Sequence, residues 1–194
     1  FGSISELPQG AVVGSSSLRR RAQLALRRPD LHLVEFRGNV QTRLKKLEDG
    51  VAVATFLAMA GLSRLGMLDV ARGAVDPDEM LPAVAQGCIG VERRADDARS
   101  SAMLAAIADH DSALRMAAER AFLARLDGSC QTPIAGLAVL RGDRLHLRGE
   151  ILRPDGSEVI AGEREGPARD GAAMGTDLAN ELRARAPADF FDWG

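Results

Sequence analysis

Ala11-Val-Val-Gly-Ser-Ser-Ser-Leu-Arg-Arg20 joins a short apolar strand, through a glycine and three serines, to the start of a helix. The serines are suited to cap that helix, and the glycine lets the backbone approach a ligand closely. Arg19 and Arg20 fall in the first helical turn, where cations are disfavoured because the helix N-terminus carries partial positive charge. Residues that break a local rule are often retained for function, so this loop is predicted to bind an anion.

The alternation of strand and helix continues after this loop. We expect helices at residues 18–28, 40–49 and 60–66, and strands at residues 11–14, 31–36 and 51–58. The last of these strands is apolar throughout, which is typical of a strand buried on both faces. Such an order predicts a parallel sheet with right-handed crossovers, in which ligands bind beyond the carboxyl ends of the strands.

A second loop leaves a strand at the same predicted edge and carries Arg37 and Arg43 around Gly38 and Asn39. Arginine binds carboxylate or phosphate through two parallel hydrogen bonds. Four arginines at one sheet edge therefore indicate a small polyanionic ligand, with surface charge as the alternative. The remaining basic side chains here are interpreted as a solvated helix face: Arg21, Arg27, Arg28, Lys45 and Lys46.

Composition excludes several classes of protein. The 194 residues are 46% hydrophobic and 27% charged, as in ordinary globular domains, and the net charge of −2 offers no general attraction to nucleic acid or membrane. The two cysteines suit a reducing cytoplasm, and the three histidines match no metal-ligand spacing. We expect a cytoplasmic monomer with no metal and with neither nucleic acid nor membrane as partner.

The chain changes character after residue 75. Residues 76–82, rich in proline and acidic side chains, are predicted to be a connector, and residues 83–91 a turn followed by a strand that buries Cys88. Two helices are expected next, one with Met103, Leu104 and Ile107 inward and one that begins at about residue 111. Three strands follow, at residues 134–140, 145–152 and 158–162. The chain is expected to end in a helix with Met174, Leu178 and Leu182 on one face. This last part is predicted to be α+β, with an antiparallel meander packed by helices.

One loop of this region presents a cysteine. Leu126-Asp-Gly-Ser-Cys130-Gln-Thr-Pro-Ile134 follows a helix, with Gly128 as the expected helix stop and Pro133 closing the loop. Free cysteines are usually buried as small hydrophobic residues, whereas Cys130 is flanked by polar and flexible ones. The loop favours a thiol with a chemical role, and the alternative is a solvent-exposed thiol with none.

Five blocks, in order, resemble the porphobilinogen deaminase (hydroxymethylbilane synthase) family over nearly the whole chain. They are Val13-Gly-Ser-Ser-Ser-Leu-Arg-Arg20, Phe36-Arg-Gly-Asn-Val-Gln-Thr-Arg-Leu44, Ala60-Gly-Leu-Ser-Arg-Leu-Gly66, Leu81-Pro-Ala-Val-Ala-Gln-Gly87 and Leu126-Asp-Gly-Ser-Cys-Gln-Thr-Pro-Ile134. The resemblance implies a transferase of tetrapyrrole biosynthesis that joins four porphobilinogen units head to tail, with release of ammonia.

The resemblance also implies roles for individual residues. The product grows on a dipyrromethane cofactor, which is held by a thioether to Cys130, and every pyrrole carries an acetate and a propionate. Cofactor-binding positions by this resemblance are Ser17, Arg19, Arg20, Gln86 and Gly87, with the last two at a hinge between domains. Substrate-binding positions are Arg37, Arg43 and Arg64.

Two departures from the family pattern affect these expectations. The family has three domains, and the first begins before the position that matches Phe1, together with the aspartate credited with proton transfer. No residue of this sequence matches that aspartate, so no catalytic residue is identified. Val53 also stands where the family usually has an acidic residue.

The predicted architecture is therefore a periplasmic-binding-protein-like α/β domain with a parallel or mixed sheet, followed by a small α+β domain. We expect the first at residues 1–82, a returning segment of the family's N-terminal domain at residues 83–108, and the second at residues 109–194. Two alternatives to an active enzyme stay open. The chain is an inactive fragment, or it is a non-catalytic anion-binding module, to which the presented thiol of Cys130 would be of no use.

Overall fold

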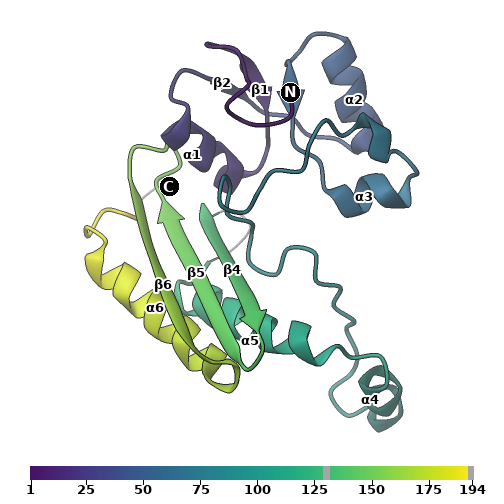
Figure 1. Cartoon of the computed structure of the whole chain (residues 1–194), viewed down its shortest axis with the longest axis vertical. Helices are drawn as coiled ribbons and strands as arrows, with labels where there is room; N and C mark the ends of the chain where they lie inside the picture. The colour runs from purple at the N-terminus through teal and green to yellow at the C-terminus, as the bar shows by residue number, and fades with distance from the viewer. Residues whose placement is uncertain (129–131, 192–194) are drawn as a thin grey trace.

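The computed structural model describes residues 1–128 and 132–191, which form two units that each contain a three-stranded sheet (Figure 1). We call residues 1–82 the N-terminal unit and residues 109–191 the C-terminal unit. Residues 83–108 form an extended stretch that includes the small helix α4, Ala98–Ala105. Within the described part of the chain, no helix is both long and apolar enough to cross a membrane.

The sheet of the N-terminal unit is parallel, as predicted, with the strand order β2-β1-β3. Its strands are β1 (Val12–Gly14), β2 (His32–Val34) and β3 (Ala54–Thr55). Its helices are α1 (Leu18–Arg27), α2 (Val40–Glu48) and α3 (Met59–Arg64), followed by the 3-10 turn η1 (Leu68–Val70). The predicted alternation of strand and helix is confirmed.

The expectation of a third strand buried on both faces is wrong. β3 covers only two residues of the run 51–58, and the side chains of Val51 and Val53 are about half exposed, at 49% and 53%. β3 pairs only with β1 and forms an edge of the sheet, so part of the apolar run lies on an uncovered side. Within this run Ala52 is buried and residues 54–57 are partly buried, whereas Val53 is a surface residue.

Arg28, interpreted above as a solvated side chain, has a structural role instead. Its guanidinium donates hydrogen bonds to the backbone carbonyls of Ile4 and Leu7 at 3.0 and 2.9 Å and pairs with Asp30 at 2.8 Å. These bonds fasten the first ten residues onto the end of α1. Ile4 and Leu7 are thereby buried in the core of the N-terminal unit.

The C-terminal unit confirms the predicted antiparallel meander, with the strand order β4-β5-β6. Its strands are β4 (Ile134–Arg141), β5 (Arg144–Leu152) and β6 (Val159–Pro167), which extends beyond the expected residue 162. Helices α5 (His110–Arg125) and α6 (Gly171–Arg185), the latter preceded by the 3-10 turn η2 (Ala168–Asp170), pack on one face of the sheet (Figure 1). Fully buried side chains such as Phe122, Leu147 and Leu178 form the core between them.

Residues 83–108 differ from the prediction. No strand forms at residues 83–91, and Cys88, expected to be buried, is exposed. Met103 and Ile107, expected to face inward, are 64% and 76% exposed, while Leu104 is half-buried. The apolar pattern presupposes a surface to pack against, and no described element covers the exposed Ile89, Val91, Met103 and Ile107.

The connector between the units is held on both sides. On one side the Leu81 carbonyl accepts hydrogen bonds from Arg19 Nη1 at 2.5 Å and Gln23 Nε2 at 2.9 Å, both from α1. On the other side the Pro82 carbonyl accepts from the Gly136 amide of β4 at 3.0 Å. The connector therefore joins α1 to the antiparallel sheet.

The buried carboxylate of Glu119 on α5 adds a second attachment. It accepts hydrogen bonds from the backbone amides of Ala85 at 2.6 Å and Ala138 at 2.8 Å. Ala85 lies in the left-handed region, at φ 63°, which turns the chain toward this carboxylate. Glu119 thus ties the connector to both α5 and β4.

Candidate anion-binding site

The carboxyl ends of the three parallel strands lie together because their loops are hydrogen-bonded to one another. The Ser15 amide donates to the Val34 carbonyl at 2.9 Å, and Ser16 Oγ accepts from the Phe36 amide at 2.9 Å. A Cβ at position 14 would lie 2.4 Å from the Phe36 ring, so only glycine allows β1 and the loop after β2 to approach this closely. The two arginine-bearing loops are thereby fixed side by side.

Helix α1 begins at this edge with its N-terminus free of acidic side chains. Ser17 is the N-cap, and its Oγ accepts a hydrogen bond from the Arg20 amide at 3.4 Å. Ser15 Oγ accepts from the Ser17 amide at 3.3 Å. The partial positive charge of the helix and two guanidinium groups coincide here, which makes this end of α1 a favourable place for an anion.

Arg19 is the most deeply buried of the predicted site residues, with only 6% of its surface exposed. Besides its bond to the Leu81 carbonyl, Arg19 Nη2 donates to Gln86 Oε1 at 3.5 Å, while Nε has no hydrogen-bond partner among the described residues. Burial, and then the charge of Arg20, lower the pKa of Arg19 to about 10, while Glu150 acts in the opposite direction. Arg19 remains a cation at neutral pH.

Arg20 and Arg43 lie close enough to repel each other. Burial, and then the charge of Arg43, lower the pKa of Arg20. Arg20 Nη1 donates to the Phe56 carbonyl at 3.4 Å and its guanidinium lies 5.8 Å from the centre of the Phe56 ring, whereas Arg43 Nε donates to the Gly38 carbonyl at 2.9 Å. Within residues 1–128 and 132–191, no carboxylate forms an ion pair with Arg19, Arg20 or Arg43.

The other two predicted arginines do not join this cluster. Arg37 projects into solvent and pairs with Glu35 at 2.8 Å, with 80% of its side chain exposed. Arg64 lies exposed at the end of α3. The structure therefore divides the predicted set into a partly buried cluster of Arg19, Arg20 and Arg43 and two exposed cations.

Gln86 and Gly87 lie where the connector leaves the N-terminal unit. The contact of Gln86 with Arg19 links this turn directly to the arginine cluster. Gly87 adopts φ 87°, a conformation that favours glycine. Cys130 falls within residues 129–131, outside the described residues.

The ends of the Cys130 segment are described. The helix stop differs from the prediction: α5 ends at Arg125, and Asp127 rather than Gly128 takes the left-handed conformation, with φ 54°. A Cβ at Gly128 would lie 2.5 Å from a terminal methyl of Leu123, so a larger residue there would make that side chain move.

Sequence reasoning missed two buried polar residues near this site. Gln23 and Glu150 are 0% and 7% exposed, and the Oε1 atom of each is buried with no hydrogen-bond partner in the described structure. Glu150 lies on the face of β5 that points away from the core. A signal for it existed: the apolar Leu152 follows on that same face, which indicates that another element covers this end of the strand.

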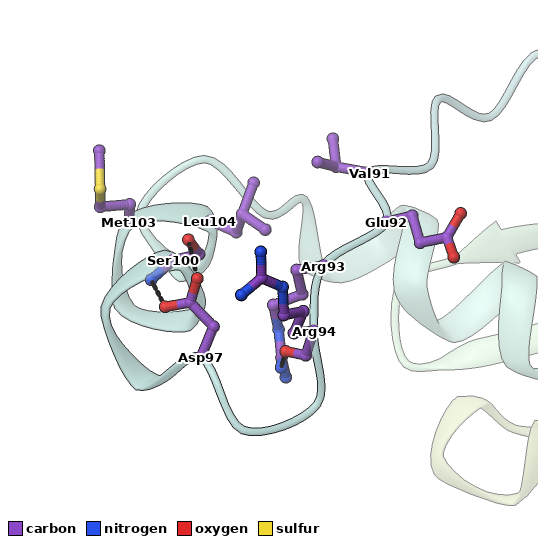
Figure 2. Close-up of a pocket in the computed structure, with 8 residues that line it drawn as sticks. All are labelled: Val91, Glu92, Arg93, Arg94, Asp97, Ser100, Met103 and Leu104. Atoms are coloured by element: carbon purple, nitrogen blue, oxygen red, sulfur yellow. Dashed lines mark hydrogen bonds between the residues drawn. The ribbon is translucent and has the colours of Figure 1, made fainter.

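One hollow of the described surface lies away from the arginine cluster. It has a volume of about 820 Å³ and is lined by residues 91–104 around α4, including Arg93 and Arg94 (Figure 2). Figure 1 shows α4 at the far end of the molecule from α1. In the described residues, no group of three or more His, Cys, Asp or Glu side chains is arranged to hold a metal ion.

Comparison with known proteins gives consistent matches along the chain. Residues 1–102 match the family model described as porphobilinogen deaminase, dipyromethane cofactor binding domain. Residues 113–184 match the model described as porphobilinogen deaminase, C-terminal domain.

Curated relatives match over almost the whole chain. A porphobilinogen deaminase from Paracoccus denitrificans is 88% identical over 193 residues, which is 100% of this chain and 62% of the relative. One from Nitrobacter winogradskyi is 52% identical over 190 residues, 98% of this chain and 60% of the relative. One from Nitrobacter hamburgensis is 51% identical over 189 residues, 97% of this chain and 60% of the relative. The chain thus spans about 60% of the length of these relatives.

Proposed function

The chain belongs to the porphobilinogen deaminase family, and on this premise we propose that the protein carrying it joins four porphobilinogen units into hydroxymethylbilane, with release of ammonia. The observation that supports this most strongly is the cluster of Arg19, Arg20 and Arg43, which has no carboxylate partner within the described structure. The growing product is a polyanion, since every pyrrole carries an acetate and a propionate. Such a ligand would neutralise these cations.

The residues fit the dipyrromethane cofactor that the matched family model names. The group carries several carboxylates, and the site offers the free Nε of Arg19, the guanidinium of Arg20 and the N-terminus of α1. When bound, dipyrromethane supplies the pyrrole end to which the first substrate unit is joined. Cys130 would hold it through a thioether, while Ser17, Arg19 and Arg20 hold its carboxylates.

The proposal assigns the other predicted residues by their position. Gln86 and Gly87 form the turn beside Arg19, where Gln86 orients the guanidinium through its Oε1. Arg43, beside Arg20, would hold the carboxylates of substrate units. Arg37, which pairs with Glu35, and Arg64 are both exposed, and we assign them to the attraction of porphobilinogen to the site. Fixed cations of this kind lower the barrier by holding the reacting units in place.

We extend the proposal to the organisation of the chain. The packing of two separate cores supports a division into residues 1–82, 83–108 and 109–194, with the Cys130 loop in the last. The expected environment is the cytoplasm, which suits a chain with two cysteines, and the expected state is a monomer without nucleic acid. No catalytic carboxylate is assigned.

The test uses the full-length polypeptide that carries this sequence. Intact mass and peptide mapping should locate a dipyrromethane adduct on Cys130, and Cys130→Ala should remove both the adduct and the release of bilane. Cys88→Ala is the matched control, because Cys88 is exposed yet lies outside the proposed site. An adduct on Cys88, or full turnover of the Cys130→Ala protein, would overturn the proposal.

A further inference from the structure

Glu150 is a buried carboxylate that the proposed function does not use. It lies on β5, where Leu145, Leu147 and Ile151 face the core and Glu150 faces the opposite way. That outer face is covered at this end by α1 of the other unit, and the turn at Gly156 packs directly against the α1 backbone. Glu150 is consequently 93% buried between the two units although it belongs to the polar face of its strand.

The surroundings of Glu150 carry charges of both signs, since Asp78 and Glu163 line the same hollow as Arg27 and Arg148. This hollow of about 320 Å³ lies between the units and is also lined by Leu81 and Glu150. Burial raises the pKa of Glu150, and the charges of Arg27, then Arg19, then Arg148 lower it. Arg148 already has a partner, Asp78, at 2.5 Å, whereas Arg27 and Arg19 form no ion pair in the described structure. The charge of Glu150 is therefore opposed mainly by arginines of α1.

The position of Arg19 does not depend on Glu150. Its guanidinium is fixed by the Leu81 carbonyl and by Gln86, and Gln23 braces the same carbonyl. In its ionised form Glu150 contributes negative charge in a buried interface where solvent screens it weakly, while burial raises its pKa and so favours the neutral form. The same negative charge faces any carboxylate that approaches Arg19.

We propose that Glu150 is an internal counter-anion that acts through Arg19 and weakens the binding of carboxylate ligands at the N-terminus of α1. The inference rests on the proposed function, which places ligand carboxylates at Arg19. An anion site of this kind must hold a polyanionic product firmly enough to build it and loosely enough to release it. Glu150 sets this balance from the C-terminal unit, so the contact between α1 and β5 would adjust affinity at a site on the other unit.

The inference predicts an unusual direction for the change in ligand affinity. Replacing a residue that merely stabilises the site would weaken ligand binding, whereas removing the charge of Glu150 should strengthen it. We expect Glu150→Gln and Glu150→Met each to tighten the binding of a carboxylate probe by about 3- to 10-fold, because an opposing charge has been removed from a poorly screened interface. Glu150→Asp keeps the charge and should stay within about 2-fold of the unaltered protein.

The experiment is an NMR titration of the full-length protein, prepared free of dipyrromethane, with the dicarboxylate glutarate. The readout is the Nε–Hε signal of Arg19, which is buried and has no acceptor among the residues that the structure describes. Glu163→Gln is the matched control, since Glu163 lines the same hollow but its side chain is 69% exposed, and it should leave the affinity unchanged. Thermal unfolding shows which of the two neutral variants is folded, and either one decides the question.

The possible outcomes separate the inference from its premise. Tighter glutarate binding in the neutral variants, with Glu163→Gln unchanged, supports the role of Glu150. If the unaltered protein binds glutarate at Arg19 but a folded neutral variant binds it equally or more weakly, the inference is overturned while the proposed function stands. If glutarate does not shift the Arg19 signal in the unaltered protein, the anion site itself is wrong.

Discussion

The most deeply buried arginines of the N-terminal unit are arranged differently from three arginines of the C-terminal unit, although Arg28 and Arg37 of the N-terminal unit are also paired. In the C-terminal unit, Arg144, Arg153 and Arg164 each pair with one or two carboxylates of neighbouring strands, turns or helices. In the N-terminal unit, Arg19 and Arg20 are more deeply buried, and yet neither forms an ion pair in the described structure. Burial of a cation is costly unless it is compensated.

This difference separates arginines that are neutralised within the protein from arginines whose charge is available to a ligand. Exposed ion pairs like those of the C-terminal unit contribute little to stability, but they neutralise their own charge. Cations that are fixed by backbone carbonyls, as Arg19 is by Leu81, keep their charge available for a ligand. Both units have an apolar core, but the N-terminal unit keeps unpaired, partly buried cations at one edge of its sheet, which is what the proposed anion site requires.

The largest effect is expected when the unpaired arginines are tested without the rest of the polypeptide, to see whether they suffice for the reaction. We expect residues 1–194, expressed alone, to release no detectable hydroxymethylbilane from porphobilinogen. The pyrrole nitrogens need a nearby carboxylate to stabilise positive charge and transfer protons, and in the described structure no carboxylate forms an ion pair with Arg19 or Arg20. The assay is porphobilinogen consumption together with bilane release. Robust turnover would show that a carboxylate of this chain serves.

Substitution of single arginines sharpens the contrast in the full-length protein. Arg19→Leu and Arg20→Leu should each lower kcat/KM for porphobilinogen roughly 10- to 150-fold, the equivalent of about 1.5–3 kcal/mol for one lost charge-assisted contact. Arg144→Leu removes an exposed, paired arginine and should change kcat/KM by less than about 2-fold. Equal effects at Arg20 and Arg144 would contradict the division between the units.

Glu119 tests whether the C-terminal unit uses a buried charge to stabilise its structure and not to bind a ligand. Glu119→Gln leaves an amide that can accept from only one of the Ala85 and Ala138 amides at a time without a clash. Hydrogen exchange at the Ala138 amide should then speed up in line with a loss of about 1–3 kcal/mol. Glu163→Gln, on the exposed part of β6, does not touch the Glu119 carboxylate and should leave that exchange rate unchanged.

The pH dependence of stability should also differ between the units. Arg28 holds the pKa of Asp30 well below its usual range, so the stability from this pair is present above the ordinary Asp pKa and is lost as pH falls through the lower folded value. Burial raises the pKa of Glu119, so its contribution has the opposite sign, and stability falls as pH rises through the window above its ordinary value. Asp30→Asn should abolish the first dependence and Glu119→Gln the second, as measured by thermal unfolding at pH 3–7. An unchanged pH profile in Asp30→Asn would refute the structural role of Arg28.

Much of the fold follows from local sequence pattern. The strand–loop–helix from Val12 to Arg27 and the meander from Ile134 to Pro167 were predictable, because turn residues and apolar periodicity specify them locally. Burial was less predictable, because it depends on what covers an element. Val53 and Met103 belong to apolar patterns, but no described element covers them.

The candidate site shows the same limit. Arg19, Arg20 and Arg43 could be grouped from sequence, because parallel strands bring their following loops to one edge. Glu150 could not be placed with them, because alternation along β5 assigns it to a solvated face. Only the packing of α1 on that face, hinted at by Leu152, buries it beside arginines that lie more than a hundred residues earlier in the chain.

The attachment of the connector to β4 also has a consequence for the tendency of the protein to aggregate. β4 is an outer strand of its sheet, and its outward amides at Gly136 and Ala138 are occupied by the Pro82 carbonyl and the Glu119 carboxylate. An outer strand with free amides is a template on which another chain can add a strand. The buried carboxylate of Glu119 occupies one of these amides, and it does not offer the alternating donors and acceptors with which a further strand could pair. Cleavage between residues 82 and 86 would therefore do more than separate the two units, because it would free the Gly136 amide for intermolecular pairing while Glu119 still occupies the Ala138 amide.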